Sequence, residues 1–111
     1  MEQSWKQIRV EESQDLAYVT LIDENYLEDW QIKELQDELL PVVDEIKERR
    51  IVIDFSNVRF MSSAFLGLLI RVLKRASEQN GSLELVNIHP SIHKVFKITS
   101  LDKVFDIGKT K

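Results

Sequence analysis

Two adjacent serines, Ser62 and Ser63, are the side chains of this chain best placed for chemistry. They follow a short apolar segment and a polar loop, and they precede a strongly apolar segment with helical periodicity, so they stand where a helix begins. Backbone N–H groups at a helix start lack partners within the helix, and a serine hydroxyl can accept from them. The same N–H groups and the helix dipole also suit a phosphate. A serine here is therefore either a plain helix cap or a phosphorylation switch.

Asp54 interrupts the apolar segment just before the serine loop. It falls at the carboxyl edge of the expected sheet, where open α/β sheets place their sites. A strand-end carboxylate that accepts N–H bonds from the loop is the simpler interpretation, and participation in chemistry is the alternative.

Motifs for catalysis and for metal binding are scarce. The sequence has no Gly-rich phosphate loop and no GxSxG around either serine, so we expect no enzymatic activity and no cofactor. His89 and His93 are four residues apart, but Pro90 places His89 at or before a helix start and no third ligand stands nearby. We therefore expect no metal site.

Alternating apolar and polar residues predict the elements that position the serines. Short β-rich segments at 8–10 and 16–22, separated by a polar turn, predict a hairpin with its first strand at an edge. Further strands are expected at 51–55, 83–88 and 104–107, alternating with helices, which implies parallel pairing with right-handed crossovers. The predicted fold class is α/β: a small single-domain mixed sheet, the N-terminal hairpin plus parallel strands, packed with about three to four helices.

The long helix before the third strand has a clear apolar face. Asp29 is its expected N-cap, and its apolar stripe runs from Ile32 to Ile46. Pro41 removes one hydrogen bond, so a kink or break is expected near Leu40.

The helix after the serines has a broader apolar surface. Phe65 and Leu68 lie on its flank, where they either pack against the preceding helix or form an exposed apolar patch for a partner. The expected core stripe consists of Leu66, Leu69, Ile70 and Leu73.

Composition limits the class of protein. The 111 residues suit one domain, 1–111 with a core at about 8–107, and 43% apolar with 31% charged residues suits a packed globular core. Cys is absent, and no apolar run approaches the roughly 20 residues that a membrane span needs, so we expect a cytoplasmic protein. A net charge of −4 argues against nucleic-acid binding. Residues 1–70 carry 15 acidic and 7 basic side chains, and residues 71–111 carry 4 and 8, so the charge is uneven.

The segment 54–76, DFSNVRFMSSAFLGLLIRVLKRA, resembles the signature of STAS domains, the anti-sigma-factor antagonist family. In that family a strand ending in Asp is followed by a loop, a serine-bearing helix start, and Leu-Gly one turn later. The tail 95–107, VFKITSLDKVFDI, is similar to the family's ending, where a short helix precedes the last strand. The resemblance covers about residues 8–107.

The resemblance implies a binding module that captures a serine kinase serving as an anti-sigma factor. That kinase phosphorylates a serine at the helix start, which breaks the complex, and a serine phosphatase reverses the modification. Carried over by position, Ser63 is the acceptor, with Ser62 as its rival. We expect the module to be a monomer or a weak dimer. The expected partner surface includes Asp54, Ser62, Ser63, Phe65 and Leu68.

This chain departs from the family pattern at two positions. Many members have an acidic residue where this chain has Ser62, and Gly where it has Phe65. The first change removes a charge that would repel a phosphate, and the second changes the contact surface. The alternative functions are a scaffold of the same fold that is never phosphorylated, and a nucleotide-binding protein that uses the sheet edge near Asp54.

Overall fold

The computed structural model describes residues 6–108 and shows a five-stranded mixed sheet in the order β1-β2-β4-β6-β7. β1 pairs with β2 antiparallel, and the other neighbours are parallel. The predicted fold class is confirmed. The strands of this sheet are β1 (Ile8–Glu12), β2 (Leu16–Leu21), β4 (Arg50–Asp54), β6 (Ser82–Val86) and β7 (Asp106–Ile107). The helices are α1 (Asp29–Glu45), α2 (Ser63–Glu78) and α3 (Pro90–Ile98), with a 3-10 turn, η1 (Leu101–Lys103).

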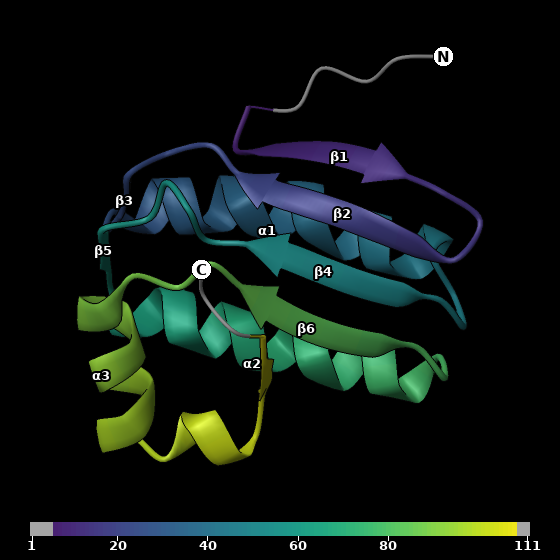
Figure 1. Cartoon of the computed structure of the whole chain (residues 1–111). Coiled ribbons are helices and arrows are strands. Elements are labelled where there is room, and N and C mark those ends of the chain that lie inside the picture. The colour runs from purple at the N-terminus through teal and green to yellow at the C-terminus, as the bar shows by residue number, and fades with distance from the viewer. Residues whose placement is uncertain (1–5, 109–111) are drawn as a thin grey trace.

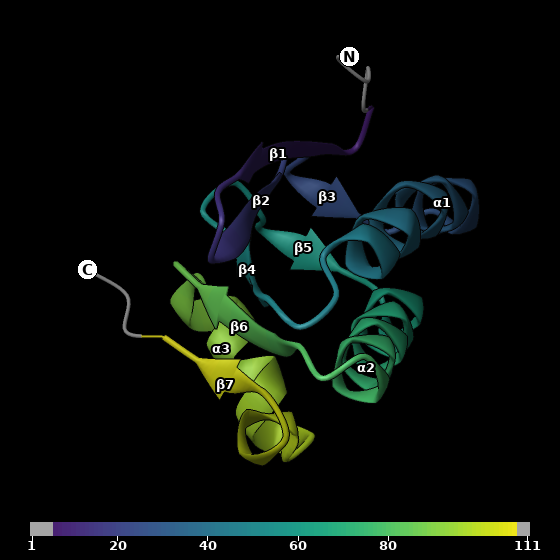
Figure 2. The same ribbon diagram turned by 90° about the vertical axis from the view of Figure 1, so that its right-hand side faces the viewer.

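The two long helices, α1 and α2, run side by side on one face of the sheet (Figures 1 and 2). Alternate residues of the central strands point to these helices and are buried, among them Val19, Ile53 and Leu85. The intervening residues, such as Tyr18 and Asp54, point to the opposite face. The core therefore lies between the sheet and this helical layer.

Both helices depart from their predicted details. The N-cap of α1 is Glu28, with no side-chain cap, and Asp29 is the first helical residue. α1 continues through Pro41 to Glu45, so the helix is not broken near Leu40 as expected. The apolar stripe of α1 is confirmed, since every member is buried: Ile32, Leu35, Leu39, Val42, Val43 and Ile46.

The core face of α2 is rotated from the predicted stripe. Its buried residues are Phe65, Leu68, Leu69, Val72 and Ala76. Of the predicted stripe only Leu69 is fully buried; Leu66 and Leu73 are partly buried, and Ile70 is 42% exposed. The helix turns Phe65 and Leu68 inward together with Leu69, and it leaves Leu66 and Leu73 at the edge of the core.

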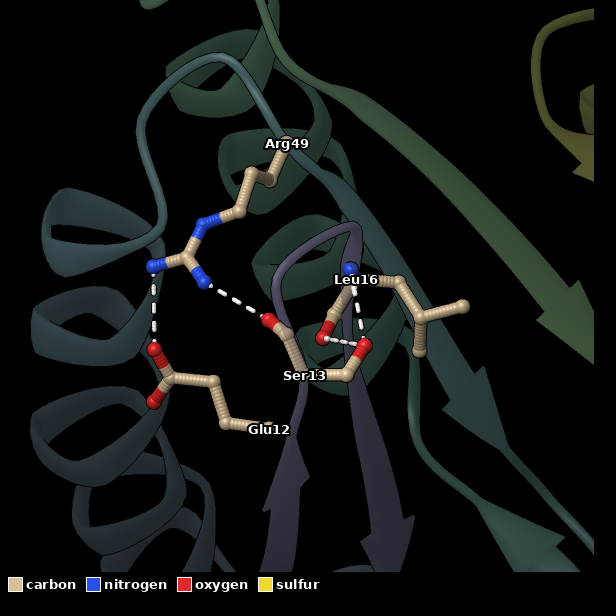
Figure 3. Close-up of polar contacts among 4 residues, drawn as sticks. All are labelled: Glu12, Ser13, Leu16 and Arg49. Atoms are coloured by element: carbon tan, nitrogen blue, oxygen red, sulfur yellow. Dashed lines mark hydrogen bonds and ion pairs between the residues drawn. The ribbon is translucent and has the colours of Figure 1, made fainter.

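The end of the molecule away from the start of α2 is closed by polar contacts (Figure 3). Arg49, which precedes β4, donates from Nη1 to the backbone oxygen of Ser13 at 2.8 Å and pairs with Glu12 at 2.9 Å. Ser13 N–H also donates to the backbone oxygen of Leu16 at 2.8 Å. The hairpin turn between β1 and β2 is thereby fastened to the connection between α1 and β4.

Two short strands that the sequence did not predict, β3 (Asn25–Tyr26) and β5 (Phe60–Met61), form a separate parallel pair. β7 is also shorter than the expected strand at 104–107, because Val104 and Phe105 form a turn between the end of η1 and the start of β7. Within residues 6–108, no helix combines the length and apolar character needed to cross a lipid bilayer.

Candidate functional site

The two serines occupy different positions at the start of α2. Ser62 is the N-cap, with extended backbone angles, and its Oγ accepts a hydrogen bond from Phe65 N–H at 3.3 Å. Ser63 is the first helical residue. The predicted helix start is therefore confirmed, and the capping role belongs to Ser62.

Ser63 is open to solvent, whereas Ser62 is only partly exposed. No hydrogen bond within residues 6–108 engages Ser63 Oγ, and the N–H groups of Ser63 and Ala64 find no acceptor there. The positive end of the α2 dipole and these N–H groups favour negative charge beside Ser63. The structure thus presents an accessible hydroxyl in surroundings that can accept a phosphate.

The serine loop is held by the β3–β5 pair (Figure 2). Arg59 N–H donates to Glu24 O at 2.8 Å, and Ser62 N–H donates to Tyr26 O at 2.9 Å. The register pairs Tyr26 with Met61. The segment leading to α2 is therefore fixed to the segment leading to α1, although the two are far apart in the sequence.

An aromatic cluster supports this loop from inside the molecule. Phe65 is fully buried, stacks on the Tyr26 ring at 5.2 Å between centroids, and meets Phe55 edge-on at 6.0 Å. Tyr26 Oη donates to Gln7 O at 3.1 Å and accepts from Asp23 N–H at 3.0 Å. Burial raises the pKa of Tyr26 to about 12, so its hydroxyl stays protonated.

The predicted partner contacts of Phe65 and Leu68 are corrected by this arrangement. Both side chains are 0% exposed. Phe65 lies in the aromatic cluster, and Leu68 lies one turn later on the same buried face of α2. Neither side chain can reach a docked protein directly, so both serve to position the start of α2.

Asp54 is held by donors from three segments. Its carboxylate accepts from Tyr18 Oη at 2.5 Å, from Ser56 N–H at 2.7 Å and from Asn87 Nδ2 at 3.2 Å. Only 8% of the residue is exposed, and it lies on the sheet face away from α1 and α2. Among the described residues, no hydrogen bond joins Asp54 to Ser62 or Ser63. The structural interpretation of this residue is therefore the better supported one.

The protonation states of this network follow from its contacts. Burial acts to raise the pKa of Asp54, but the hydrogen bonds from Tyr18, Ser56 and Asn87 outweigh it, so the pKa lies below its usual value. The hydrogen bond to Asp54, with burial and the nearby negative charge, raises the pKa of Tyr18 to about 12. At neutral pH the phenol donates to an ionised carboxylate, which is a strong pairing.

The histidines are placed at α3, away from the serines in the sequence. His89 is the N-cap of α3, and its Nδ1 accepts from Ser91 N–H at 3.2 Å. His93 lines a cavity of about 520 Å³ together with Lys97, Asp102 and Phe105. Residues 6–108 contain no cluster of three or more side chains suited to holding a metal ion. The cavity includes neither Asp54 nor the serines, so it gives no support to nucleotide binding at that sheet edge.

Sequence reasoning missed several residues near the serines. Tyr26 anchors the loop, and the apolar side chains of Leu27, Trp30 and Phe60 are about half exposed or more. For Leu27 and Trp30 a signal was present in residues 24–30, ENYLEDW, where large apolar residues stand among acidic ones outside any core periodicity.

Comparisons with known proteins agree with this geometry. The family description of the STAS domain matches residues 7–111. An anti-sigma-B factor antagonist of Bacillus subtilis is 31% identical over 74 residues, which cover 67% of this chain and 66% of that protein. The matched segment thus spans just under two thirds of the relative's own length.

Solved structures share the fold. An anti-sigma-factor antagonist (STAS) domain protein from Planctomyces limnophilus superposes with a TM-score of 0.81 at 24% identity, covering 94% of this chain and 91% of that one. SpoIIAA, a Bacillus cell fate determinant and anti-sigma factor antagonist, superposes in its unphosphorylated form with a TM-score of 0.68 at 15% identity, covering 94% of this chain and 89% of that one. Its phosphorylated form gives 0.67 at 16% identity, covering 92% and 91%. At these identities the likeness establishes the architecture.

Proposed function

The chain belongs to the STAS domain family, and we infer that it works as an anti-sigma factor antagonist controlled by reversible phosphorylation of Ser63. In this proposal it is a cytoplasmic binding module and not an enzyme. It captures a serine kinase that serves as an anti-sigma factor, and a serine phosphatase restores the unmodified form. The observation that carries the proposal is the exposed Ser63 hydroxyl at the first position of α2.

The difference between the two serines favours Ser63 over Ser62 as the acceptor. Phosphorylation of Ser62 would modify the oxygen that caps Phe65 N–H. Ser63 Oγ has no such bond within residues 6–108, so its modification removes no contact of the fold. The existence of SpoIIAA in unphosphorylated and phosphorylated forms supports such a switch on this architecture.

The chemical step is a phosphoryl transfer carried out by the partner. Ser63 Oγ attacks the γ-phosphorus of ATP, a new O–P bond forms, and the bond to the bridging β-oxygen breaks to release ADP. The hydroxyl proton passes to a base of the kinase. In the reverse branch, phosphatase-bound water attacks phosphorus and returns the serine hydroxyl with free phosphate.

The phosphoryl group would act on binding and leave the fold intact. It adds about −1.5 to −2 charges at the positive end of a helix, where negative charge is favourable. In the partner, the same group would enter an active site that already holds nucleotide phosphates. Like charges in close contact cost several kcal/mol, which corresponds to a loss of a few orders of magnitude in affinity.

Asp54 contributes to this function by positioning. Its bond to Ser56 N–H fixes the first turn of the loop that ends at the serines. Its small exposed area leaves little surface for direct contact with a partner.

The test is incubation with the cognate kinase and ATP, followed by mapping of the modified residue by mass spectrometry. Ser63→Ala is expected to abolish labelling, and Ser63→Asp is expected to weaken the complex about tenfold or more. Ser62→Ala is the matched control: it removes the cap, at a cost of about 1 kcal/mol in stability, and retains labelling. Labelling that is lost in Ser62→Ala and kept in Ser63→Ala would transfer the role to Ser62. If Ser63→Asp leaves every complex intact, the chain is an unregulated scaffold.

A further inference from the structure

Four large apolar side chains are exposed along the segments that lead into α1 and α2, and Ile22, at 41%, is the least exposed of them. Leu27 is 48% exposed, Trp30 is 65% exposed and Phe60 is 59% exposed. We call Leu27, Trp30 and Phe60 the apolar triad. The β3–β5 pair and the N-termini of α1 and α2 gather at the end of the molecule that carries the serines (Figures 1 and 2).

The strand register places the triad beside the serines. Asn25 is paired with Phe60 and Tyr26 with Met61. Adjacent residues of a strand point to opposite faces. Because Tyr26 points into the core, its two neighbours, Asn25 and Leu27, point outward, on the same side as Phe60. Leu27 therefore follows the last pair at the level of Ser62, whose N–H bonds to Tyr26 O at 2.9 Å. Trp30 lies in the first turn of α1, three residues beyond Leu27.

The surroundings of the triad are acidic. Asp23, Glu24, Glu28 and Asp29 are all exposed in the segment that holds two of its members. Two exposed positive charges accompany them: Arg59 next to Phe60, and Lys33 one turn beyond Trp30 in α1. Glu28 makes no side-chain cap to α1, so its carboxylate is available to an approaching molecule. We call Asp23, Glu24, Glu28 and Asp29 the acidic rim.

We propose that the apolar triad is the anchor on which the Ser63 kinase docks, and that the acidic rim steers a basic surface of that kinase onto it. The inference rests on the proposed function. A kinase that reaches Ser63 must cover the start of α2, and a stable interface covers about 800 Å² on each partner, a disc roughly 16 Å in radius. The triad lies within such a disc centred on Ser63. Leu27 neighbours Ser62, Phe60 is three residues before Ser63, and Trp30 is three residues beyond Leu27 in the first turn of α1.

The chemistry of the three side chains suits an anchor. Interfaces gain most of their affinity from a few large residues, with tryptophan strongly enriched, that fill desolvated pockets near the centre. The partner surface predicted here is therefore an apolar pocket bordered by Lys or Arg. Another apolar surface lies on α3 and the turn after it, where Ile98 is 82% and Val104 is 54% exposed. That surface carries neither serine and supplies a matched control.

The test measures the dissociation constant of the complex with the cognate anti-sigma kinase by calorimetry. Trp30→Ala and Phe60→Ala are each expected to raise it about 10- to 100-fold, and Ile98→Ala is expected to leave it unchanged. All three side chains are largely exposed, so the thermal midpoints should stay close to that of the native chain. At saturating kinase, Trp30→Ala should still be labelled at Ser63, because the triad affects docking and not the acceptor.

The acidic rim is tested through the association rate. Glu28→Gln is expected to slow association several-fold and to weaken its dependence on salt, because rim charges act mainly on the encounter. Glu45→Gln, an exposed carboxylate at the far end of α1, is the matched control and should leave the rate unchanged.

The outcomes separate the two proposals. If the native chain binds the kinase and is labelled at Ser63, while Trp30→Ala and Phe60→Ala bind as tightly as it does, the docking inference is wrong and the proposed function stands. If the native chain neither binds nor is labelled by the kinase, both proposals fall together.

Discussion

Asp54 shows how one buried carboxylate can hold several segments of a fold together. Its donors come from β2, from the serine loop and from the segment after β6. Asn87 adopts a left-handed backbone conformation with φ of 58°, which asparagine tolerates better than most residues. The acidic side chain thus ties the connections that follow β4 and β6 to the middle of β2.

Replacing Tyr18 by Phe tests this role through the dependence of stability on pH. The change removes the hydroxyl donor, and we expect the free energy of unfolding at pH 7 to fall by about 1–2 kcal/mol. Because the pKa of Asp54 is lowered by folding, the stability it contributes is present above the ordinary carboxyl pKa of about 4 and is lost as pH falls through the folded value. Urea unfolding at pH 7, 5 and 3 should show the difference between native and variant shrinking toward low pH.

The alkaline side provides an independent check on the same bond. The pKa of Tyr18 is raised to about 12, so the native chain should lose stability between pH 10 and 12, where the unfolded phenol ionises first. Tyr18→Phe should lack that part of the loss. A native-to-variant difference that stays constant across the whole range would contradict the pairing.

At the scale of elements, the serine loop owes its shape to the β3–β5 pair. Each strand has only two residues, and the pair joins segments 35 positions apart in the register. Alternation over two residues is too short a pattern to identify a strand from sequence. This connection could be seen only in the folded chain.

The rest of the fold was more accessible to sequence reasoning. Two elements were identified correctly from their patterns: the helix with the apolar stripe from Ile32 to Ile46, and the alternating strand β2. Each pattern is long enough to distinguish helical from strand periodicity. The buried face of α2 was predicted wrongly, since apolar residues surround much of that helix and periodicity alone left its orientation open. Only tertiary contacts decide between Phe65 and Leu66 as the inward residue, and the ring of Tyr26 provides the deciding partner.

The two glycines near the ends of α2 give a matched pair of predictions at this scale. A Cβ added at Gly67 would meet only Arg71 Nη1 at 3.8 Å, whereas one at Gly81 would lie 2.8 Å from the backbone oxygen of Arg49. Gly67→Ala is expected to stabilise the domain by about 0.5–1 kcal/mol, and Gly81→Ala to destabilise it by about 1–3 kcal/mol. Thermal unfolding measures both. Equal shifts in the two variants would contradict the packing described at the turn between α2 and β6.

At the scale of the whole molecule, one apolar cluster joins the sheet to both long helices. Phe65 stands within it beneath the serines, and the cluster continues through Phe55 to Phe96 and Phe105. A substitution under the serine loop is therefore expected to lower the free energy of unfolding of the entire domain.

Two phenylalanines five residues apart test this statement. Phe65→Ala removes a fully buried ring and is expected to lower the free energy of unfolding by about 3–5 kcal/mol, a large share of the roughly 5–15 kcal/mol typical of a domain. Phe60→Ala removes an exposed ring and should change it by about 0.5 kcal/mol or less. Urea denaturation followed by circular dichroism compares them. A small loss for Phe65→Ala would show that the aromatic cluster packs loosely.

The two neighbouring serines have different roles, and this difference affects how such proteins can diversify. Because Ser62 caps α2 and no hydrogen bond within residues 6–108 engages Ser63 Oγ, a single codon change at Ser63 would remove the proposed phosphate acceptor with little penalty to folding. Descendants of this chain can therefore gain or abandon regulation while keeping the same scaffold. Position 62 is under a different constraint, since losing its hydroxyl weakens the helix in every descendant, regulated or not.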